Sequence, residues 1–435
     1  MKAVFQASAA ALVVLFTAVG DAADSFRPTP LAVQTVYRNG VPHTDRNGKL
    51  RLDYDRQLSL FPIGIYHGLN GEFSGTRYGF RTLKEAGFNT VLPWRDQPMD
   101  TVMAAAADAG LQVIWHDPTD EEAAKFGTHP ALLGWDIDHE PSVDPPDAAA
   151  EARLERFMER KSRLQAIALS HPAFTINSPS ISEPRTALWQ AWARAGDLVA
   201  FWKYPFFGAP VTTLTGPRGV PEVTALAVSS AEQRKPVLYI AQAFRGQSLD
   251  WEFPNPDAAR AMVYAALVHG ATGVVWFALD SFVTRNDDVL GMHPEPAANY
   301  GIALAGGKVP LREETAEYLA ESRRMWGTVI QINKELTGLT PVLLSPTSDR
   351  SYSVAVAGSA ANDTPIRTVL KMVDDGYVLI AVNVDAFPVV ARFDMRSAVR
   401  DLERLDGGEA VPETTNGQFK DLFAPFAVRI YRLRM

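Results

Sequence analysis

Cysteine is absent from the 435-residue chain, which excludes disulfides, thiolate catalysis and cysteine-ligated zinc. Positive charge is scarcer than negative charge, because 42 Lys and Arg face 50 Asp and Glu and leave a net charge of -8. Nucleic acids and anionic membranes select basic surfaces, so neither is an expected partner. The chain also lacks a Gly-x-Gly-x-x-Gly loop and a phosphate-loop lysine motif, so no nucleotide cofactor is expected.

The N-terminus has the pattern of an export signal. Lys2 precedes an apolar run over 9–19, and small residues at 20–22 predict cleavage after Ala22. The apolar run is short for a membrane-spanning helix. We therefore expect residues 1–22 to be removed and the mature protein to be secreted or periplasmic, with no membrane contact. A cysteine-free exported chain fits a bacterial periplasm or exterior better than a small disulfide-stapled fold.

Apolar runs of strand length alternate with segments of helical periodicity through much of the chain. Eight runs are predicted to be strands: 60–66, 89–94, 111–116, 132–140, 174–177, 198–204, 237–244 and 273–280. Helices are predicted among them at 78–86, 101–109, 148–169, 184–195, 220–234 and 256–269. This order predicts an α/β fold, a (β/α)8 TIM barrel with its active site at the C-terminal ends of the strands. An open doubly wound sheet is the alternative, and it has no phosphate loop to support it.

The segments before and after the barrel have a different texture. Short strands around turn signals are predicted at 31–38 and 50–54, and a long helix at 311–336. Alternating strands follow at 352–357, 368–373, 377–384, 389–393 and 427–433. The predicted organisation is a signal peptide over 1–22, a barrel with an N-terminal hairpin over 27–336, and a small antiparallel β-sandwich over 340–435.

The fourth predicted strand carries an acidic face. If 132–140 is a strand, Asp136, Asp138 and Glu140 share one face, and apolar side chains occupy the other. Crowded carboxylates raise the pKa of at least one of them, which is what a general acid requires. We predict Glu140 as general acid and Asp138 as its partner. A solvated acidic face is the alternative, but the apolar opposite face favours a strand covered by helices.

Polar and aromatic side chains stand at the ends of the other predicted strands, where they would meet at one rim. Aromatic rings stack on the apolar face of a pyranose while polar groups bind its hydroxyls, so this mixture favours a sugar site. The predicted substrate-binding residues are Trp94, Arg95, His116, Tyr204, Gln242, Trp276 and Asp280.

Three segments, in order, resemble the barrel of retaining glycoside hydrolases related to cellulases and β-galactosidases. They are Phe-Pro-Ile-Gly-Ile-Tyr at 61–66, Leu-Lys-Glu-Ala-Gly-Phe-Asn at 83–89 and His-Pro-Ala-Leu-Leu-Gly-Trp at 129–135. Strand four of those enzymes ends in Asn-Glu-Pro, whose Glu is the acid/base, and this chain has His139-Glu140-Pro141. The resemblance covers about 31–335 and implies a polysaccharide or oligosaccharide substrate, with no cofactor.

The chain departs from that family at strand seven. The family places a nucleophilic Glu at the end of this strand, where the present chain has Gln242. An amide cannot form the glycosyl ester, so ordinary double displacement through this residue is excluded.

Three interpretations remain open. The 136–140 segment resembles the Asp-x-Asp-x-Glu of the chitinase family, in which Asp138 would orient a substrate acetamido group as nucleophile and Gln242 would bind the sugar. Alternatively, the enzyme inverts, with Asp280, Asp96 or Asp117 as base across a gap of roughly 6.5 to 9.5 Å. The third interpretation is a non-catalytic carbohydrate-binding protein built on the same barrel.

A metal-dependent hydrolase is a further class that the sequence offers. His116, Asp117, Asp138 and His139 could in principle hold a metal ion. However, no His-x-x-x-His or His-Glu-x-x-His spacing supports such a site. We therefore expect no metal and interpret His139 as a packing or hydrogen-bonding replacement for the family's Asn.

Overall fold

The structure is a computed structural model. It describes residues 36–66, 79–93, 95, 97–141, 148–168, 171–179, 185–208, 210–246, 250–279, 282–283, 288–292, 300–303, 308–310, 316–357, 359, 364–407 and 411–435. The predicted signal peptide and the candidate residues Trp94, Asp96 and Asp280 lie outside these ranges. Within them, no helix is both long and apolar enough to span a bilayer.

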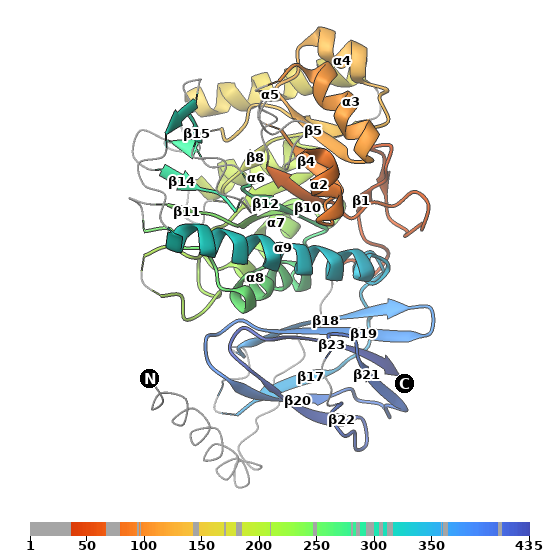
Figure 1. Cartoon of the computed structure of the whole chain (residues 1–435). Coiled ribbons are helices and arrows are strands. Elements are labelled where there is room, and N and C mark those ends of the chain that lie inside the picture. The colour runs from red at the N-terminus through yellow and green to blue at the C-terminus, as the bar shows by residue number, and fades with distance from the viewer. Residues whose placement is uncertain are drawn as a thin grey trace.

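A parallel sheet closes into a barrel (Figure 1). Its nine strands run in the order β7-β6-β5-β4-β3-β12-β10-β9-β8. Strand β7 pairs with β6 and β8 pairs with β9, and only Thr175 separates β7 from β8. These two short strands therefore form one strand of the barrel. The barrel thus has eight strands, which we call staves. All eight predicted strands are therefore confirmed. Their bounds are β3 Ile63–Tyr66, β4 Thr90–Leu92, β5 Gln112–His116, β6 Leu132–Asp136, β7 Ala173–Phe174, β8 Ile176–Asn177, β9 Val199–Trp202, β10 Val237–Gln242 and β12 Gly273–Phe277.

Helices surround the barrel at the predicted positions. They are α2 Phe80–Glu85, α3 Met99–Ala109, α5 Ala148–Ile167, α6 Arg185–Ala195, α7 Val220–Ser230, α8 Pro256–Val268 and α9 Ala316–Leu343. The short helix α4 (Asp120–Phe126) was not predicted; it begins with a capping box in which Thr119 and Glu122 bond each other's backbone N–H groups. Helix α9 extends beyond the predicted end at 336 and includes Pro341.

Side chains of the staves divide between two apolar layers. One layer fills the barrel interior, and the other packs the outer face of the staves against the helices. Interior residues include Tyr66, Leu92, Ile114, Leu133, Phe174, Ile176, Ala200, Ile240 and Val275. Residues that alternate with them, such as Ile65, Trp115 and Trp276, pack in the outer layer. This division decides which strand-end residues can face the barrel mouth.

Two smaller β structures accompany the barrel. The N-terminal hairpin pairs β1 (His43–Thr44) with β2 (Leu50–Arg51), whereas the predicted strand at 31–38 is a turn over its described part, 36–38. Five short strands, one before β12 and four after it, form a sheet that was not predicted, in the order β11-β14-β13-β15-β16. Their bounds are β11 Arg245–Gly246, β13 Phe282–Val283, β14 Asp288–Leu290, β15 Tyr300–Ala303 and β16 Lys308–Pro310.

The C-terminal strands form the predicted antiparallel β-sandwich. One sheet has the order β17-β20-β22 and the other β18-β19-β23-β21. Strands β21 and β22 were not predicted, because their side chains are mostly polar or half exposed. The bounds are β17 Ser353–Val356, β18 Ile366–Val373, β19 Gly376–Asn383, β20 Val389–Asp394, β21 Asp401–Arg404, β22 Gln418–Phe423 and β23 Val428–Arg434.

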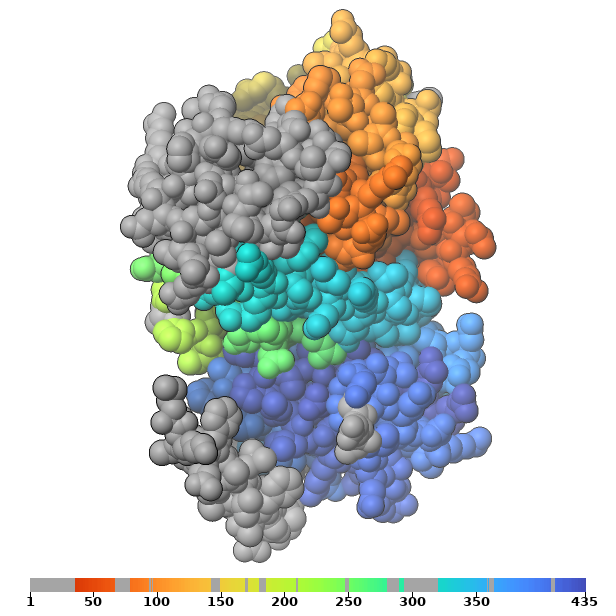
Figure 2. All heavy atoms as spheres, in the orientation of Figure 1, coloured from red at the N-terminus to blue at the C-terminus, as the bar shows by residue number. Residues whose placement is uncertain are grey.

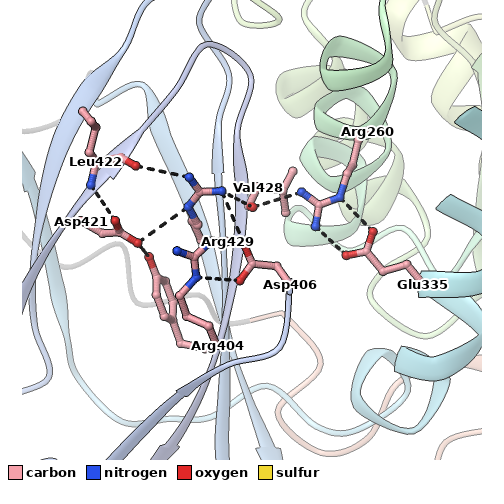
Figure 3. A network of polar contacts seen from close by, with 9 residues as sticks. Arg260, Glu335, Arg404, Asp406, Asp421, Leu422, Val428 and Arg429 are labelled. Atoms are coloured by element: carbon pink, nitrogen blue, oxygen red, sulfur yellow. Dashed lines mark hydrogen bonds and ion pairs between the residues drawn. The ribbon is translucent and has the colours of Figure 1, made fainter. Parts of the chain in front are cut away.

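Helices α8 and α9 lie between the barrel and the sandwich (Figure 1), and the surface of α9 forms a band between the two in Figure 2. Apolar side chains of β19 and β23, such as Ile380 and Ile430, belong to the same buried layer as α8. Arg260 of α8 pairs with Glu335 of α9 at 2.6 Å and donates to the carbonyl of Val428 at 3.1 Å (Figure 3). A shared apolar layer and the polar contacts of Arg260 therefore join the barrel and the sandwich.

Candidate functional site

The acidic strand ends earlier than predicted. Strand β6 stops at Asp136, and both Asp138 and Glu140 have positive φ angles, of 55° and 49°. A register shift where β6 pairs with β5 also turns Leu133 into the barrel interior. The three carboxylates therefore do not share one face of a strand. Each one has its own surroundings.

Asp136 is the buried centre of a polar network at the barrel mouth. Its side chain is fully buried, and Oδ2 lies 2.6 Å from Nδ1 of His116 and 2.6 Å from Nδ1 of His139. Oδ1 accepts a hydrogen bond from the backbone N–H of Ile176 at 3.1 Å. Burial alone would raise the pKa of Asp136, but the two imidazoles outweigh it and hold that pKa well below the ordinary value. Asp136 is thus ionised, and both histidines donate from Nδ1.

The same network changes the charge of His139. Burial lowers the pKa of His139, but the charge of Asp136 and its hydrogen bond outweigh burial, so the pKa is raised. The imidazole therefore carries its proton to a higher pH than an ordinary histidine does. The sequence indicated a packing or hydrogen-bonding replacement for Asn; His139 does form a hydrogen bond, and its partner is a buried carboxylate that favours the protonated imidazole.

His116, Asp136 and His139 are also the described residues that could hold a metal ion, because their ligand atoms lie within 4.8 Å of one another. A metal ion held at about 2.0 to 2.2 Å keeps its ligand atoms about 3 Å apart or more. The 2.6 Å contacts leave no such space between these atoms. These distances fit hydrogen bonds between the carboxylate and the two imidazoles better than coordination of a metal ion.

Glu140 lies beyond the end of β6, on the exposed side of this network. Its backbone N–H donates to the carbonyl of Ile176 at 3.0 Å, which fixes the turn. Burial raises the pKa values of Tyr66 and Tyr204; for Tyr66 the charge of Asp136 adds to this, and the charge of Glu140 raises both pKa values further. Within the described part of the chain no hydrogen bond or ion pair ties the Glu140 carboxylate. It is exposed and available to a ligand.

Asp138 is not placed as the partner of Glu140. Its carboxylate oxygens each lie 2.8 Å from Nε of Arg153 on α5, and Nη2 of Arg153 lies 2.5 Å from Oδ1. A left-handed backbone at Asp138 turns the side chain toward this helix. The sequence-based pairing assumed that the strand continued through Asp138, and the structure shows that it does not.

Gln242 ends β10 facing inward, but its amide is fully committed to the backbone. Oε1 accepts from the N–H of Phe206 at 3.0 Å, and Nε2 donates to the carbonyls of Phe206 at 3.1 Å and Glu252 at 3.0 Å. The side chain is fully buried. The prediction that Gln242 binds the sugar therefore does not fit this structure. A Glu here would lose both donated hydrogen bonds.

Two other predicted residues have side chains that are bonded to other parts of the protein. Trp276 packs in the layer between the staves and the helices, and its Nε1–H donates to Asn333 of α9 at 3.0 Å. Its neighbour Phe277 faces inward instead. Arg95 donates to the carbonyl of Asp117 at 2.5 Å and pairs with Glu122 of α4 at 3.2 Å. The prediction for Trp276 is wrong, and Arg95 is engaged at the edge of the barrel.

Aromatic rings line the mouth around the remaining predicted residues. Tyr204 stacks on Trp202 with ring centroids 4.9 Å apart and on Phe277 at 5.8 Å. Tyr66 lies 5.2 Å from Phe277 and 6.0 Å from His116. The structure therefore brings together Glu140, His116 and Tyr204 of the predicted set. Tyr66 and Phe277 were missed; Tyr66 ends the predicted strand 60–66, whereas Phe277 ends β12 three residues before the predicted end at 280.

No family model and no curated protein matches the chain. Solved structures do match its fold. A β-galactosidase from Bacillus circulans sp. alkalophilus covers 86% of this chain and 99% of its own at 10% identity, with a TM-score of 0.56. A protein described as a glycoside hydrolase covers 91% and 97% at 15% identity, with a TM-score of 0.52. AmyP in complex with maltose covers 85% and 96% at 10% identity, with a TM-score of 0.50. The chain therefore shares the fold of these structures, and its own structure shows this fold as a (β/α)8 barrel followed by a β-sandwich.

Proposed function

We propose that the protein is an exported glycoside hydrolase that cleaves O-glycosidic bonds of a polysaccharide or oligosaccharide, with Glu140 as general acid. One observation carries the proposal: Glu140 is exposed just beyond the C-terminal end of β6, at the end of the barrel where Tyr66 ends β3 and Tyr204 follows β9. Active sites of such barrels lie at this end of the strands. The fold neighbours make glycoside hydrolysis the chemistry to test first.

Inversion is the mechanism that fits best. An amide at Gln242 cannot act as a nucleophile, and the Asp138 carboxylate that would orient an acetamido group is held by Arg153. In an inverting step, Glu140 gives its proton to the leaving oxygen while a second carboxylate takes a proton from the water that attacks the anomeric carbon. Asp117, Asp96 and Asp280 remain the candidates for that base.

The test is product release from a panel of polysaccharides that includes acetamido sugars. Wild-type protein is compared with Glu140→Gln, and the anomer released first is identified by NMR. The proposal expects cleavage by the wild type, a loss of at least about a hundredfold in Glu140→Gln, and a product of inverted configuration. Cleavage that survives Glu140→Gln would contradict the acid assignment.

A carbohydrate-binding protein without catalysis is the second candidate. The amide of Gln242 favours it. Nε2 of this buried side chain donates two hydrogen bonds to backbone carbonyls, and a catalytic carboxylate at this position could not donate them. Binding of oligosaccharides to the wild type without any cleavage across the panel would support this candidate against the enzyme.

A further inference from the structure

A row of aromatic rings leads from Tyr66, whose ring centroid lies 6.3 Å from that of His139, to the exposed Phe207. Ring centroids are 5.2 Å apart for Tyr66 and Phe277, and 5.8 Å apart for Phe277 and Tyr204. The row continues from Tyr204 to Trp251 at 5.9 Å and from Trp251 to Phe207 at 4.7 Å. The proposed function uses only the inner end of this row.

The outer end of the row is exposed. Phe207 is 54% exposed, and Trp251 is half-buried. An exposed phenylalanine contributes little to folding, because most of its ring stays in water. The two rings are nevertheless held in place by the backbone: Phe207 and Trp251 form an antiparallel β-bridge, and Gly208 N–H donates to the carbonyl of Asp250 at 2.9 Å.

Gln242 braces both ring-bearing segments from inside the barrel. Its amide bonds the N–H and the carbonyl of Phe206, which precedes Phe207, and the carbonyl of Glu252, which follows Trp251. One buried side chain therefore fixes two segments that follow different staves. Only an amide can accept one of these bonds and donate the other two, so the absence of a carboxylate at this position has a structural cause.

Polar groups flank the outer rings. Glu252 is exposed, and its carboxylate lies 3.7 Å from Nε of Arg245, which also pairs with Glu321 at 2.9 Å. A sugar offers an apolar ring face to Phe207 and Trp251 and hydroxyls to these charged groups. A purely apolar ligand would desolvate the charges without replacing their hydrogen bonds.

We propose that Phe207 and Trp251 form an outer sugar-stacking subsite, and that Gln242 is the positioning residue that holds it. The inference rests on the proposed function, and it specifies the substrate class as a chain of several sugar units, because the row extends from Tyr66, whose ring lies 6.3 Å from that of His139 next to Glu140, to Phe207. The subsite binds units remote from the bond that is cleaved. Loss of Phe207 therefore weakens the binding of long chains more than that of short ones.

Binding is measured in the catalytically silenced variant Glu140→Gln by calorimetry. The probes are disaccharides and hexasaccharides built from glucose, xylose, galactose or N-acetylglucosamine. Adding Phe207→Ala should weaken hexasaccharide binding about tenfold and leave disaccharide binding within about twofold, whereas Phe207→Tyr should preserve both. The matched control is Phe387→Ala, which removes a 60% exposed phenylalanine from the sandwich and should change neither.

Gln242 is tested by Gln242→Glu in the active protein, with Phe207→Ala measured beside it. A positioning role predicts that both variants raise KM for hexasaccharides by a similar factor, with a smaller change in kcat. Trp251 fluorescence should also respond to hexasaccharide in the wild type and lose that response in Gln242→Glu. If Gln242→Glu does not fold, the Phe207→Ala and Phe207→Tyr pair decides the question.

The outcomes separate the two proposals. Glu140-dependent cleavage with unchanged hexasaccharide binding in Phe207→Ala overturns the subsite and leaves the hydrolase standing. Hexasaccharide binding that depends on Phe207 without any cleavage supports the subsite and contradicts the hydrolase. A wild type that neither binds nor cleaves any sugar of the panel contradicts both.

Discussion

Arg153 holds the carboxylate of Asp138 with Nε at 2.8 Å from each oxygen, so the acid two residues before Glu140 serves helix α5 and not the proposed reaction. The Asp138→Asn change should therefore reduce kcat/KM by less than about threefold. It should destabilise the protein by about 1 to 2 kcal/mol, because charge-assisted hydrogen bonds are lost. Urea denaturation and initial rates measure the two effects.

The matched control for Asp138 is Arg153→Met, which removes the same contact from the other side. It should give a similar loss of stability and a similar, small change in rate. If kcat/KM fell a hundredfold or more in Asp138→Asn but not in Arg153→Met, Asp138 would act in the reaction. A mechanism with an acetamido group of the substrate as nucleophile would then fit again.

The Asp136 network predicts a stability that depends on pH. The folded-state pKa of Asp136 is lowered from 3.8, so its contribution is present above that value and is lost as the pH falls through the lowered pKa. The pKa of His139 is raised from 6.5, so its contribution is present below 6.5 and is lost as the pH rises through the raised value. The contributions of Asp136 and His139 to stability are both fully present between about pH 4 and pH 6.5.

Asp136→Asn tests this network. The variant should be destabilised by roughly 3 kcal/mol in that window, because two partly buried imidazoles lose their charged partner, and by less at alkaline pH. NMR titration should also show a lower pKa of His139 in the variant. An unchanged His139 pKa would contradict the ion pair.

A buried lysine in the sandwich is expected to destabilise the folded protein when it is charged, whereas Asp136 and His139 stabilise it. Lys371 on β18 is 6% exposed, and its Nζ donates to the carbonyl of Ser345 at 2.7 Å. Burial lowers its pKa from 10.5 to about 7. The folded protein therefore loses stability as the pH falls from 10.5 to about 7, and the full cost is present below about 7.

Lys371→Met should stabilise the protein below pH 7 by roughly 3 kcal/mol, and this gain should vanish toward pH 10.5. Thermal melts across this range measure it, with the exposed Lys334→Met as control. A gain that does not change with pH would show that packing, and not charge, sets the effect.

The barrel was predictable because its pattern is long and repeated. Eight apolar runs with helices between them leave few alternatives, and errors at single ends do not change the order of the elements. The elements that were missed are short or polar: α4 has seven residues, and β21 alternates exposed and half-buried side chains. Such segments give weak periodicity, so only their tertiary contacts reveal them.

The site was predictable only in part. Glu140 followed from a motif, whereas Asp138 failed because alternation assumes a continuing strand and cannot show a positive φ. Trp276 failed for another reason: barrel strands are apolar on both faces, so the sequence does not say whether Trp276 or Phe277 faces inward. The bonds of Gln242 join it to residues 36 and 10 positions away, and no local sequence pattern predicts them.

The most direct test of the central claim is the dependence of the Glu140→Gln rate on the leaving group. A poor leaving group needs the proton of a general acid, and a dinitrophenolate does not. Using the sugar found to be cleaved, we expect Glu140→Gln to lose at least about a hundredfold on the natural linkage and less than about tenfold on the dinitrophenyl glycoside. Equal losses on both substrates would contradict the assignment of Glu140 as general acid.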